Sequence, residues 1–135
     1  DYVQRRAFDA APIAAALCYA LLVTDILYIN QFPDRKADEA AGKWHWVVRL
    51  GAERARWGYA VIAVFAYGAL AALTLSGNLP LLALAGLLAT PLSLRAAVVL
   101  VAHASRPQAL APAIRLTIAA ACLNGVLVAL ALFLA

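Results

Sequence analysis

Three polar residues spaced four apart, Asn30, Asp34 and Asp38, are the part of this sequence best suited to chemistry. On a helix, residues four apart lie above one another on one face. Pro33 lacks a backbone donor and clashes with the preceding turn, so the sequence predicts a helix break near Phe32, with Pro33 in the first turn of a new short helix. Asp34 and Asp38 then still share a face, with Asn30 above them at the end of the preceding segment.

Two carboxylates one turn apart, together with an amide oxygen, form a hard-oxygen site that suits Mg²⁺. This ion keeps several waters and typically joins one or two carboxylates to substrate phosphates. Four nearby cations could neutralise the phosphate oxygens that the metal does not reach: Arg35, Lys36, Lys43 and Arg49. The pattern indicates a lipid diphosphate headgroup as ligand. The same residues also fit a solvated loop of mixed charge, and spacing alone leaves both interpretations open.

Two ionisable residues, Asp25 and Arg95, interrupt otherwise apolar segments. Ionisable groups at membrane depth are rare and are functional candidates by default. We expect Asp25 either to line a polar cavity or to pair with a cation on another helix. Arg95 could be that cation, or it could extend its side chain to the membrane interface.

The elements that position these residues are expected to be membrane helices. Of the 135 residues, 66% are hydrophobic and 13% are charged, whereas a soluble domain is nearer half apolar and a quarter charged. Four Ala- and Leu-rich segments without period-two alternation are long enough to cross the bilayer, near residues 11–30, 58–75, 79–102 and 113–135. The predicted fold is an all-α transmembrane bundle of about four spans, forming a single domain over residues 1–135.

Residues 31–57 form a hydrophilic insert that holds much of the charge. Counting basic residues places this Asp-rich insert on the cytoplasmic side, with the uncharged turn at 76–80 and both chain ends outside, although Arg5 and Arg6 oppose this orientation. Four aromatic residues at the insert are expected to form an interfacial belt or to contact substrate: Trp44, Trp46, Trp57 and Tyr59. His45 is expected to be structural rather than a proton acceptor.

Other classes of function fit the sequence poorly. The net charge is only +4, and much of the charge lies in one insert rather than on a folded basic face, which disfavours nucleic-acid binding. Cys18 and Cys122 each lie in an apolar run and indicate core positions rather than a disulfide or a metal site. The chain begins without Met, which favours a processed or partial product.

The stretch NQFPDRKADEAAGKWHWVVRLG, at residues 30–51, resembles the second Asp-rich motif of the UbiA superfamily of intramembrane prenyltransferases. Members carry N-x-x-x-D-x-x-x-D, then a Gly-Lys or Gly-Arg pair and a V-R-L-G-like ending. Here Asn30, Asp34 and Asp38 are followed by a Gly-Lys pair at 42–43 and V-R-L-G at 48–51. The segments DYVQ at 1–4 and PAIRLT at 112–117 resemble the MenA-like branch, which prenylates dihydroxynaphthoate for menaquinone.

The resemblance implies a nine-helix bundle in which two Asp-rich motifs, one in each half, hold Mg²⁺ and a polyprenyl diphosphate while an aromatic acceptor is alkylated. Asp34 and Asp38 would be the catalytic metal ligands, supported by Asn30, while Lys43 and Arg35 would contact the diphosphate. This chain carries one such motif and about half of a family member's length. The other half would lie in a further segment or in another chain of a larger membrane complex, or the activity is lost.

Two functions therefore stay open. The first is a Mg²⁺-dependent prenyltransferase, or its C-terminal half, in a bacterial inner membrane. The second is a non-catalytic membrane subunit of the same fold. A small multidrug-type transporter also fits four spans, but it leaves the pattern from Asn30 to Asp38 unexplained.

Overall fold

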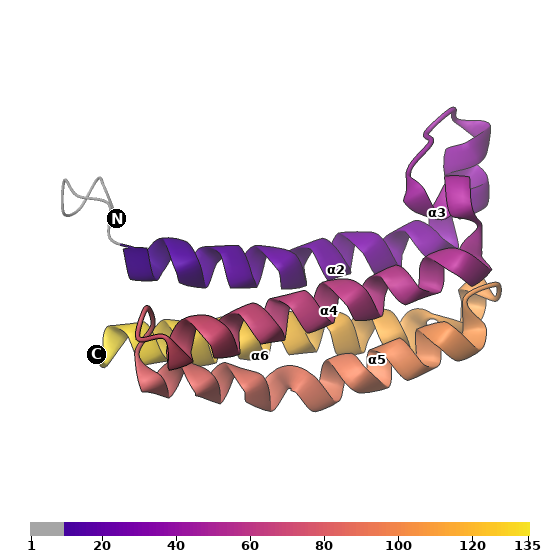
Figure 1. Cartoon of the computed structure of the whole chain (residues 1–135). Coiled ribbons are helices and arrows are strands. Elements are labelled where there is room, and N and C mark those ends of the chain that lie inside the picture. Colours follow the sequence, from indigo (N-terminus) through magenta and orange to yellow (C-terminus); the bar gives the residue numbers. More distant parts are fainter. Residues whose placement is uncertain (1–9) are drawn as a thin grey trace.

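The computed structural model describes residues 10–135, and these residues are helical apart from short connections. Four long helical stretches run side by side, and the segment containing α3 projects at one end (Figure 1). The elements are α2 (Ala10–Ala40), α3 (Trp46–Leu50), α4 (Ala52–Leu75), η1 (Leu81–Ala89), α5 (Thr90–His103), η2 (Pro107–Ala109) and α6 (Ala111–Phe133). The helices α2, α4 and α6 and the run from η1 through α5 are each long and apolar enough to cross a membrane. The prediction of an all-α bundle with four spans is confirmed.

Small side chains bring the helices together. The residues that α6 buries are mostly small: Ala113, Thr117, Ala120, Ala121, Asn124, Val128 and Ala131. Between lipid-embedded helices, close packing takes the place of the hydrophobic effect as the force that joins them, and small residues allow the backbones to approach. The bundle is therefore held by contacts of α6 with η1, α5 and α2, and of α2 with α4.

The expected break near Phe32 is wrong, because α2 continues through Pro33 to Ala40. Pro33 cannot donate to the carbonyl of Ile29, but Ile29 and Phe32 are both buried in the same core cluster as Val47 of α3. This packing holds the helix on the N-terminal side of the proline. With 31 residues, α2 is about 46 Å long at ~1.5 Å per residue, which exceeds the ~30 Å of hydrocarbon.

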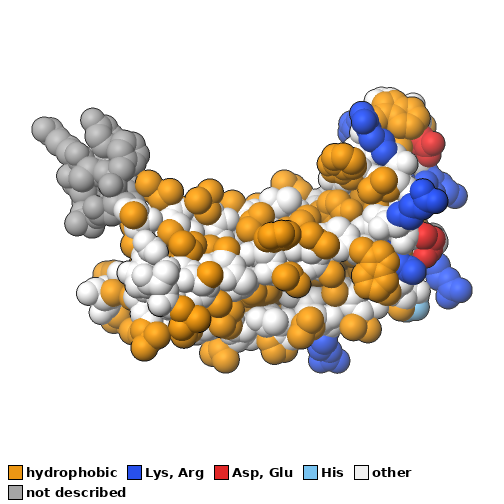
Figure 2. All heavy atoms as spheres, viewed as in Figure 1, with side chains coloured by type: hydrophobic (Ala, Val, Ile, Leu, Met, Phe, Trp, Pro, Cys, Tyr) orange, Lys and Arg blue, Asp and Glu red, His pale blue; other side chains and the backbone are white. Residues whose placement is uncertain are grey.

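The last turns of α2 therefore project beyond the apolar part of the bundle. The insert at 31–57 is mostly helical rather than a loop, since α2, α3 and α4 occupy all of it except residues 41–45 and Gly51. Lys, Arg, Asp and Glu side chains gather at this end of the molecule, while hydrophobic side chains cover its length (Figure 2). We call the region made by residues 31–57 and the connection at 104–110 the polar end.

The third span is divided between two kinds of helix. Its first nine residues, η1, have 3₁₀ geometry, and α5 follows. Pro91 has no N–H to offer the carbonyl of Leu87, and the N–H of Thr90 bonds that carbonyl instead. A proline at the start of α5 is therefore accommodated by the tighter turns before it.

Residues 1–9 lie outside the described part of the chain. The segment at 1–4 and the basic pair Arg5 and Arg6, used in the sequence analysis, fall there. The start of α2 and the C-terminus lie at the end of the bundle opposite α3 (Figure 1). This arrangement matches four antiparallel spans.

Candidate functional site at the polar end

The end of α2 folds the chain back over its own last acidic turn. Gly42 has φ of 75°, in the left-handed region that glycine tolerates. The N–H of Gly42 donates to the carbonyl of Glu39 at 3.1 Å, and the N–H of Lys43 donates to the carbonyl of Asp38 at 2.8 Å. These two bonds form a Schellman motif. The chain consequently reverses here, and Lys43 and His45 come to lie beside Asp38.

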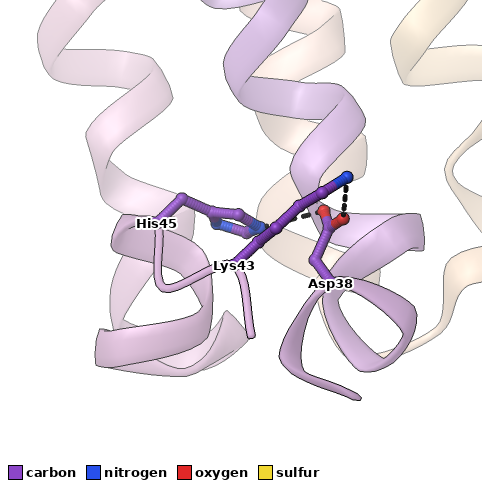
Figure 3. A network of polar contacts seen from close by, with 3 residues as sticks. All are labelled: Asp38, Lys43 and His45. Atoms are coloured by element: carbon purple, nitrogen blue, oxygen red, sulfur yellow. Dashed lines mark hydrogen bonds and ion pairs between the residues drawn. The ribbon is translucent and has the colours of Figure 1, made fainter. Parts of the chain in front are cut away.

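Both carboxylate oxygens of Asp38 have partners (Figure 3). Lys43 Nζ lies 3.2 Å from Oδ1, and His45 Nε2 lies 3.1 Å from Oδ2. The hydrogen bond from Lys43, with a further contribution from His45, holds the pKa of the Asp38 carboxyl below its ordinary value. The carboxylate is therefore ionised in water near neutral pH, and its position attracts positive charge.

Asp34 and Asp38 share a face, as predicted, and because α2 is continuous Asn30 lies on the same face four residues earlier. This face points away from the bundle. The buried stripe of α2 ends with Tyr28, Ile29 and Phe32, and Asp34 is about 200° around the helix from Phe32. Asp34 is accordingly exposed, while Asn30 and Asp38 are half-buried. We call these three residues the outer stripe.

The side chain of Asn30 is partly committed to its own helix. Its Nδ2 donates to the carbonyl of Ile26 at 2.8 Å. The amide oxygen is the acceptor that this side chain retains. Asp34 has no ion pair or side-chain hydrogen bond within residues 10–135, so both of its oxygens are free for a ligand.

The four predicted cations divide between two places. Lys43 contacts Asp38, and Arg49 donates from Nε to the carbonyl of Trp44 at 2.7 Å. Arg49 also lines a hollow of about 280 Å³ with Trp44, His45 and Trp46. Arg35 and Lys36 lie instead on the side of α2 that carries the buried stripe, and they line a different hollow. The structure therefore brings two of the four cations near the outer stripe.

The outer stripe fits the ligand chemistry of Mg²⁺. Asp34 offers a free carboxylate, and Asp38 offers one that already contacts Lys43 and His45. Within residues 10–135, no three His, Cys, Asp or Glu side chains lie close enough together to hold an ion. Because Mg²⁺ typically uses one or two carboxylates and fills its remaining positions with water and phosphate, two aspartates are a sufficient protein share.

Asp25 does not pair with Arg95, so that expectation is wrong. Asp25 is 1% exposed, and neither of its carboxylate oxygens has a hydrogen-bond partner. Arg95 is exposed and lines a surface hollow together with Leu94 and Pro112. The two residues occupy opposite surroundings, the interior and the outer surface of the bundle, which excludes a direct ion pair.

Two buried hydrogen bonds cross the interior around Asp25. Tyr59 Oη lies 3.0 Å from Thr117 Oγ1, and Tyr67 Oη lies 2.8 Å from Ser93 Oγ. Tyr59 was expected in an interfacial belt, but it is fully buried, because its hydroxyl has this partner on α6. Trp44, Trp46 and Trp57 are exposed, as a belt requires.

The two cysteines follow expectation in being free thiols, although only Cys18 is buried and Cys122 is exposed. The contact of His45 with Asp38 was not predicted. Its only signal in the sequence is the Gly42–Lys43 pair after an acidic helix end, which is typical of a chain reversal. Ser105 and Gln108, which line the hollow with Arg35 and Lys36, carry no signal in the sequence because they lie far along the chain.

Comparison with known proteins gives a family but no individual relative. No curated protein and no solved structure is similar enough to this chain to count as a match. The sequence profile described as the UbiA prenyltransferase family matches residues 2–121, which include the outer stripe and all four spans in whole or in part. The chain is therefore an integral membrane protein that belongs to the UbiA prenyltransferase family.

Proposed function

We propose that this protein takes part in the Mg²⁺-dependent transfer of a polyprenyl group from its diphosphate to an aromatic quinone precursor, with a dihydroxynaphthoate as the acceptor. One observation supports the location of the site: the stripe of Asn30, Asp34 and Asp38 runs onto the polar end, on the face of α2 that the bundle leaves open. Family membership supports the reaction class, and the menaquinone-type acceptor rests on the resemblance of residues 1–4 and 112–117.

In this proposal Asp34 and Asp38 hold Mg²⁺, and Asn30 supports them. When bound, the ion supplies positive charge that stabilises the departing diphosphate. Lys43 lies 3.2 Å from Asp38 and adds a second positive charge at the same position. The guanidinium of Arg49 uses Nε for the carbonyl of Trp44, which leaves its two terminal NH₂ groups for phosphate oxygens.

The reaction exchanges one bond for another. The bond between the allylic carbon and the diphosphate oxygen breaks, and the electron pair leaves with the diphosphate. A ring carbon of the acceptor forms a bond to the allylic carbon, and the ring regains aromaticity by losing a proton or its carboxylate as carbon dioxide. Lys43 and Arg49 would stabilise the negative charge on the leaving group, which is electrostatic catalysis by fixed charges.

The outer stripe faces away from the bundle, so another segment must shield it from water during the reaction. The described residues enclose Phe32 and Ile29 on the inner face of α2 but leave Asp34 exposed. A reactive allylic cation requires a site that excludes water. We therefore propose that a further membrane segment, either an N-terminal half or another chain, closes over the outer stripe.

The alternative function is a non-catalytic membrane subunit of the same fold. One observation favours it: Lys43 and His45 engage both oxygens of Asp38, so this carboxylate has partners within the protein itself. Under this alternative Lys43 and His45 take the place of the ion permanently. The protein would then bind no prenyl diphosphate in a Mg²⁺-dependent manner, even with its natural partners present.

The test uses membranes that contain the protein together with its natural partners. They receive Mg²⁺, a radiolabelled polyprenyl diphosphate and 1,4-dihydroxy-2-naphthoate. We expect the Asp34→Ala/Asp38→Ala variant to lose about 100-fold or more in transfer rate, the size of effect seen when electrostatic stabilisation of a transition state is removed. The matched control is Glu39→Ala, which removes an exposed carboxylate from the neighbouring position and should keep the wild-type rate.

Normal transfer by the double variant would overturn the assignment of the two aspartates. Absence of Mg²⁺-dependent prenyl diphosphate binding in wild-type membranes would instead establish the non-catalytic alternative. Transfer to hydroxybenzoate rather than to dihydroxynaphthoate would keep the reaction and reject the proposed acceptor.

A further inference from the structure

A second polar hollow lies at the inner side of the end of α2, away from the outer stripe. It has a volume of about 340 Å³ and lies between the end of α2, the start of α4 and the connection from α5 to α6. Four polar side chains contribute to its lining: Arg35, Lys36, Ser105 and Gln108. Phe32 and Pro33 of α2 form the apolar part of its wall.

The charge in this hollow is positive, and no residue within 10–135 neutralises it by an ion pair. Arg35 and Lys36 make no ion pair with any residue in the range 10–135. The acidic group next to the hollow is Glu53, whose Oε1 accepts a 2.6 Å hydrogen bond from Ser105. The other oxygen of Glu53, Oε2, lies 2.8 Å from Arg56. Glu53 is therefore already compensated, and two cations remain without a counter-ion.

The donors around the hollow match a phosphate group. A guanidinium presents paired N–H donors to phosphate oxygens, an ammonium adds a point charge, and the Gln108 amide adds a neutral donor. Ala52, the first residue of α4, also lines the hollow. The partial positive charge at the start of a long helix therefore reinforces the two side chains.

The hollow lies at the depth expected for the lipid headgroups. The apolar stretch of α2 ends before residue 31, so Arg35 and Lys36 lie just beyond the hydrocarbon. Trp57, exposed near the start of α4, is of the residue type that concentrates at the headgroup level. A ligand could enter this hollow from the membrane interface without passing the outer stripe.

We propose that this hollow binds a phosphate group carried either by an anionic lipid headgroup or by a soluble phosphate compound. This site is separate from that of the proposed transfer reaction, because Lys36 and Asp34 lie about 160° apart around α2. It needs no metal ion, since its charge comes from two side chains. Arg35 and Lys36 would then bind this phosphate group rather than the diphosphate of the prenyl donor.

The test measures lipid retention by native mass spectrometry on the protein in neutral detergent. The probes are phosphatidylglycerol, phosphatidylcholine and inorganic phosphate. We expect wild-type protein to retain phosphatidylglycerol more strongly than phosphatidylcholine, and the Arg35→Gln/Lys36→Gln variant to bind it about tenfold more weakly, because two charge-assisted bonds are lost. Arg54→Gln/Arg115→Gln removes the same charge from exposed positions outside the hollow and should retain the lipid.

The double variant Arg35→Lys/Lys36→Arg keeps both positive charges and controls for misfolding caused by substitution at these positions. It should bind phosphatidylglycerol within about threefold of wild type. Retention of phosphatidylglycerol with no displacement by inorganic phosphate identifies the lipid as the source. Binding of inorganic phosphate without any lipid identifies a soluble ligand.

Equal losses in the two charge-removing variants would overturn the proposal, as would equal retention of both lipids together with no phosphate binding. The Asp34→Ala/Asp38→Ala variant, and wild type in excess chelator, should retain phosphatidylglycerol normally. This result separates a failure of the hollow from a failure of the proposed transfer reaction.

Discussion

Asp25 and Asp38 lie in the same helix and have opposite surroundings. Asp25 is enclosed by the bundle, 1% exposed, and its oxygens have no partner. Asp38 is half-buried at the polar end, where Lys43 and His45 contact its two oxygens. The interior of the bundle thus leaves one carboxyl unsatisfied, while the polar end satisfies the other twice.

The two carboxyl groups differ because different side chains can reach them. Within the bundle, partners can come only from neighbouring helices, and those near Asp25 already bond one another through Tyr59 with Thr117 and Tyr67 with Ser93. At the polar end, the chain turns out of the helix at Gly42 and returns its own side chains to Asp38. Local chain reversal therefore supplies partners that packed helices cannot.

The largest effect is expected from a substitution that tests how tightly the bundle interior is packed. A Cβ added at Gly86 would lie 2.8 Å from Asn124 Nδ2 and from Val128 Cγ2, and 2.9 Å from Leu70 Cδ2. We expect Gly86→Ala to lower the free energy of unfolding by about 2–3 kcal/mol, as overpacking does. Unfolding in mixed micelles measures it.

The matched control for Gly86 is Gly68, an exposed position of α4 with no atom within 4 Å of an added Cβ. Gly68→Ala should raise the free energy of unfolding by up to about 1 kcal/mol, the difference in helix propensity. Equal losses at the two glycines would contradict the distinction between a packed interior and an open surface.

A smaller effect is expected from removing the unsatisfied carboxyl itself. Asp25→Asn keeps the side-chain volume and replaces an acid without a partner by a neutral amide, so we expect the free energy of unfolding to rise by about 1–2 kcal/mol. Asp25→Asn and Asp38→Asn are compared in the same micelles. A fall of about 3 kcal/mol or more at position 25 would mean that Asp25 has a charged partner, and the comparison would fail.

The smallest effect concerns the pH dependence of the Asp38 contacts. The Lys43 hydrogen bond lowers the pKa of Asp38, so the stabilising contact is present above the ordinary carboxyl pKa of about 3.9 and is lost as the pH falls through the lowered value. Lys43→Ala should raise the pKa of Asp38 toward its ordinary value. Carboxyl ¹³C NMR titration measures the change.

Lys36→Ala is the control for this titration, because it removes a cation from the opposite side of α2 and should leave the Asp38 pKa where it is. An Asp38 pKa that is the same in wild type and in Lys43→Ala would show that the chain reversal does not hold Lys43 against the carboxylate in solution.

Composition and spacing predicted the four spans and the shared face of Asp34 and Asp38, because both depend on residues close together in the chain. Pro33 misled the prediction of a break. Its local effect was outweighed by the burial of Ile29 and Phe32 against Val47 of α3, and such packing cannot be inferred from the residues next to the proline.

The remaining features of the site depend on contacts between distant segments. The hydroxyl of Tyr59 bonds to Thr117, which removes this tyrosine from the interface. The hollow that takes Arg35 and Lys36 is completed by Ser105 and Gln108. Charge type alone could not separate these two cations from Lys43 and Arg49, since the division depends on how α2 is rotated against the bundle.

Because α2 continues through Pro33, the membrane span and the acidic turns belong to one helix. Membranes thinner than its apolar stretch would tilt it, at a cost of fractions of a kcal/mol per Å of mismatch. We therefore expect a change of tilt to move Asp34 and Asp38 relative to the lipid surface. Bilayer thickness would then affect where the two carboxylates lie relative to the headgroups.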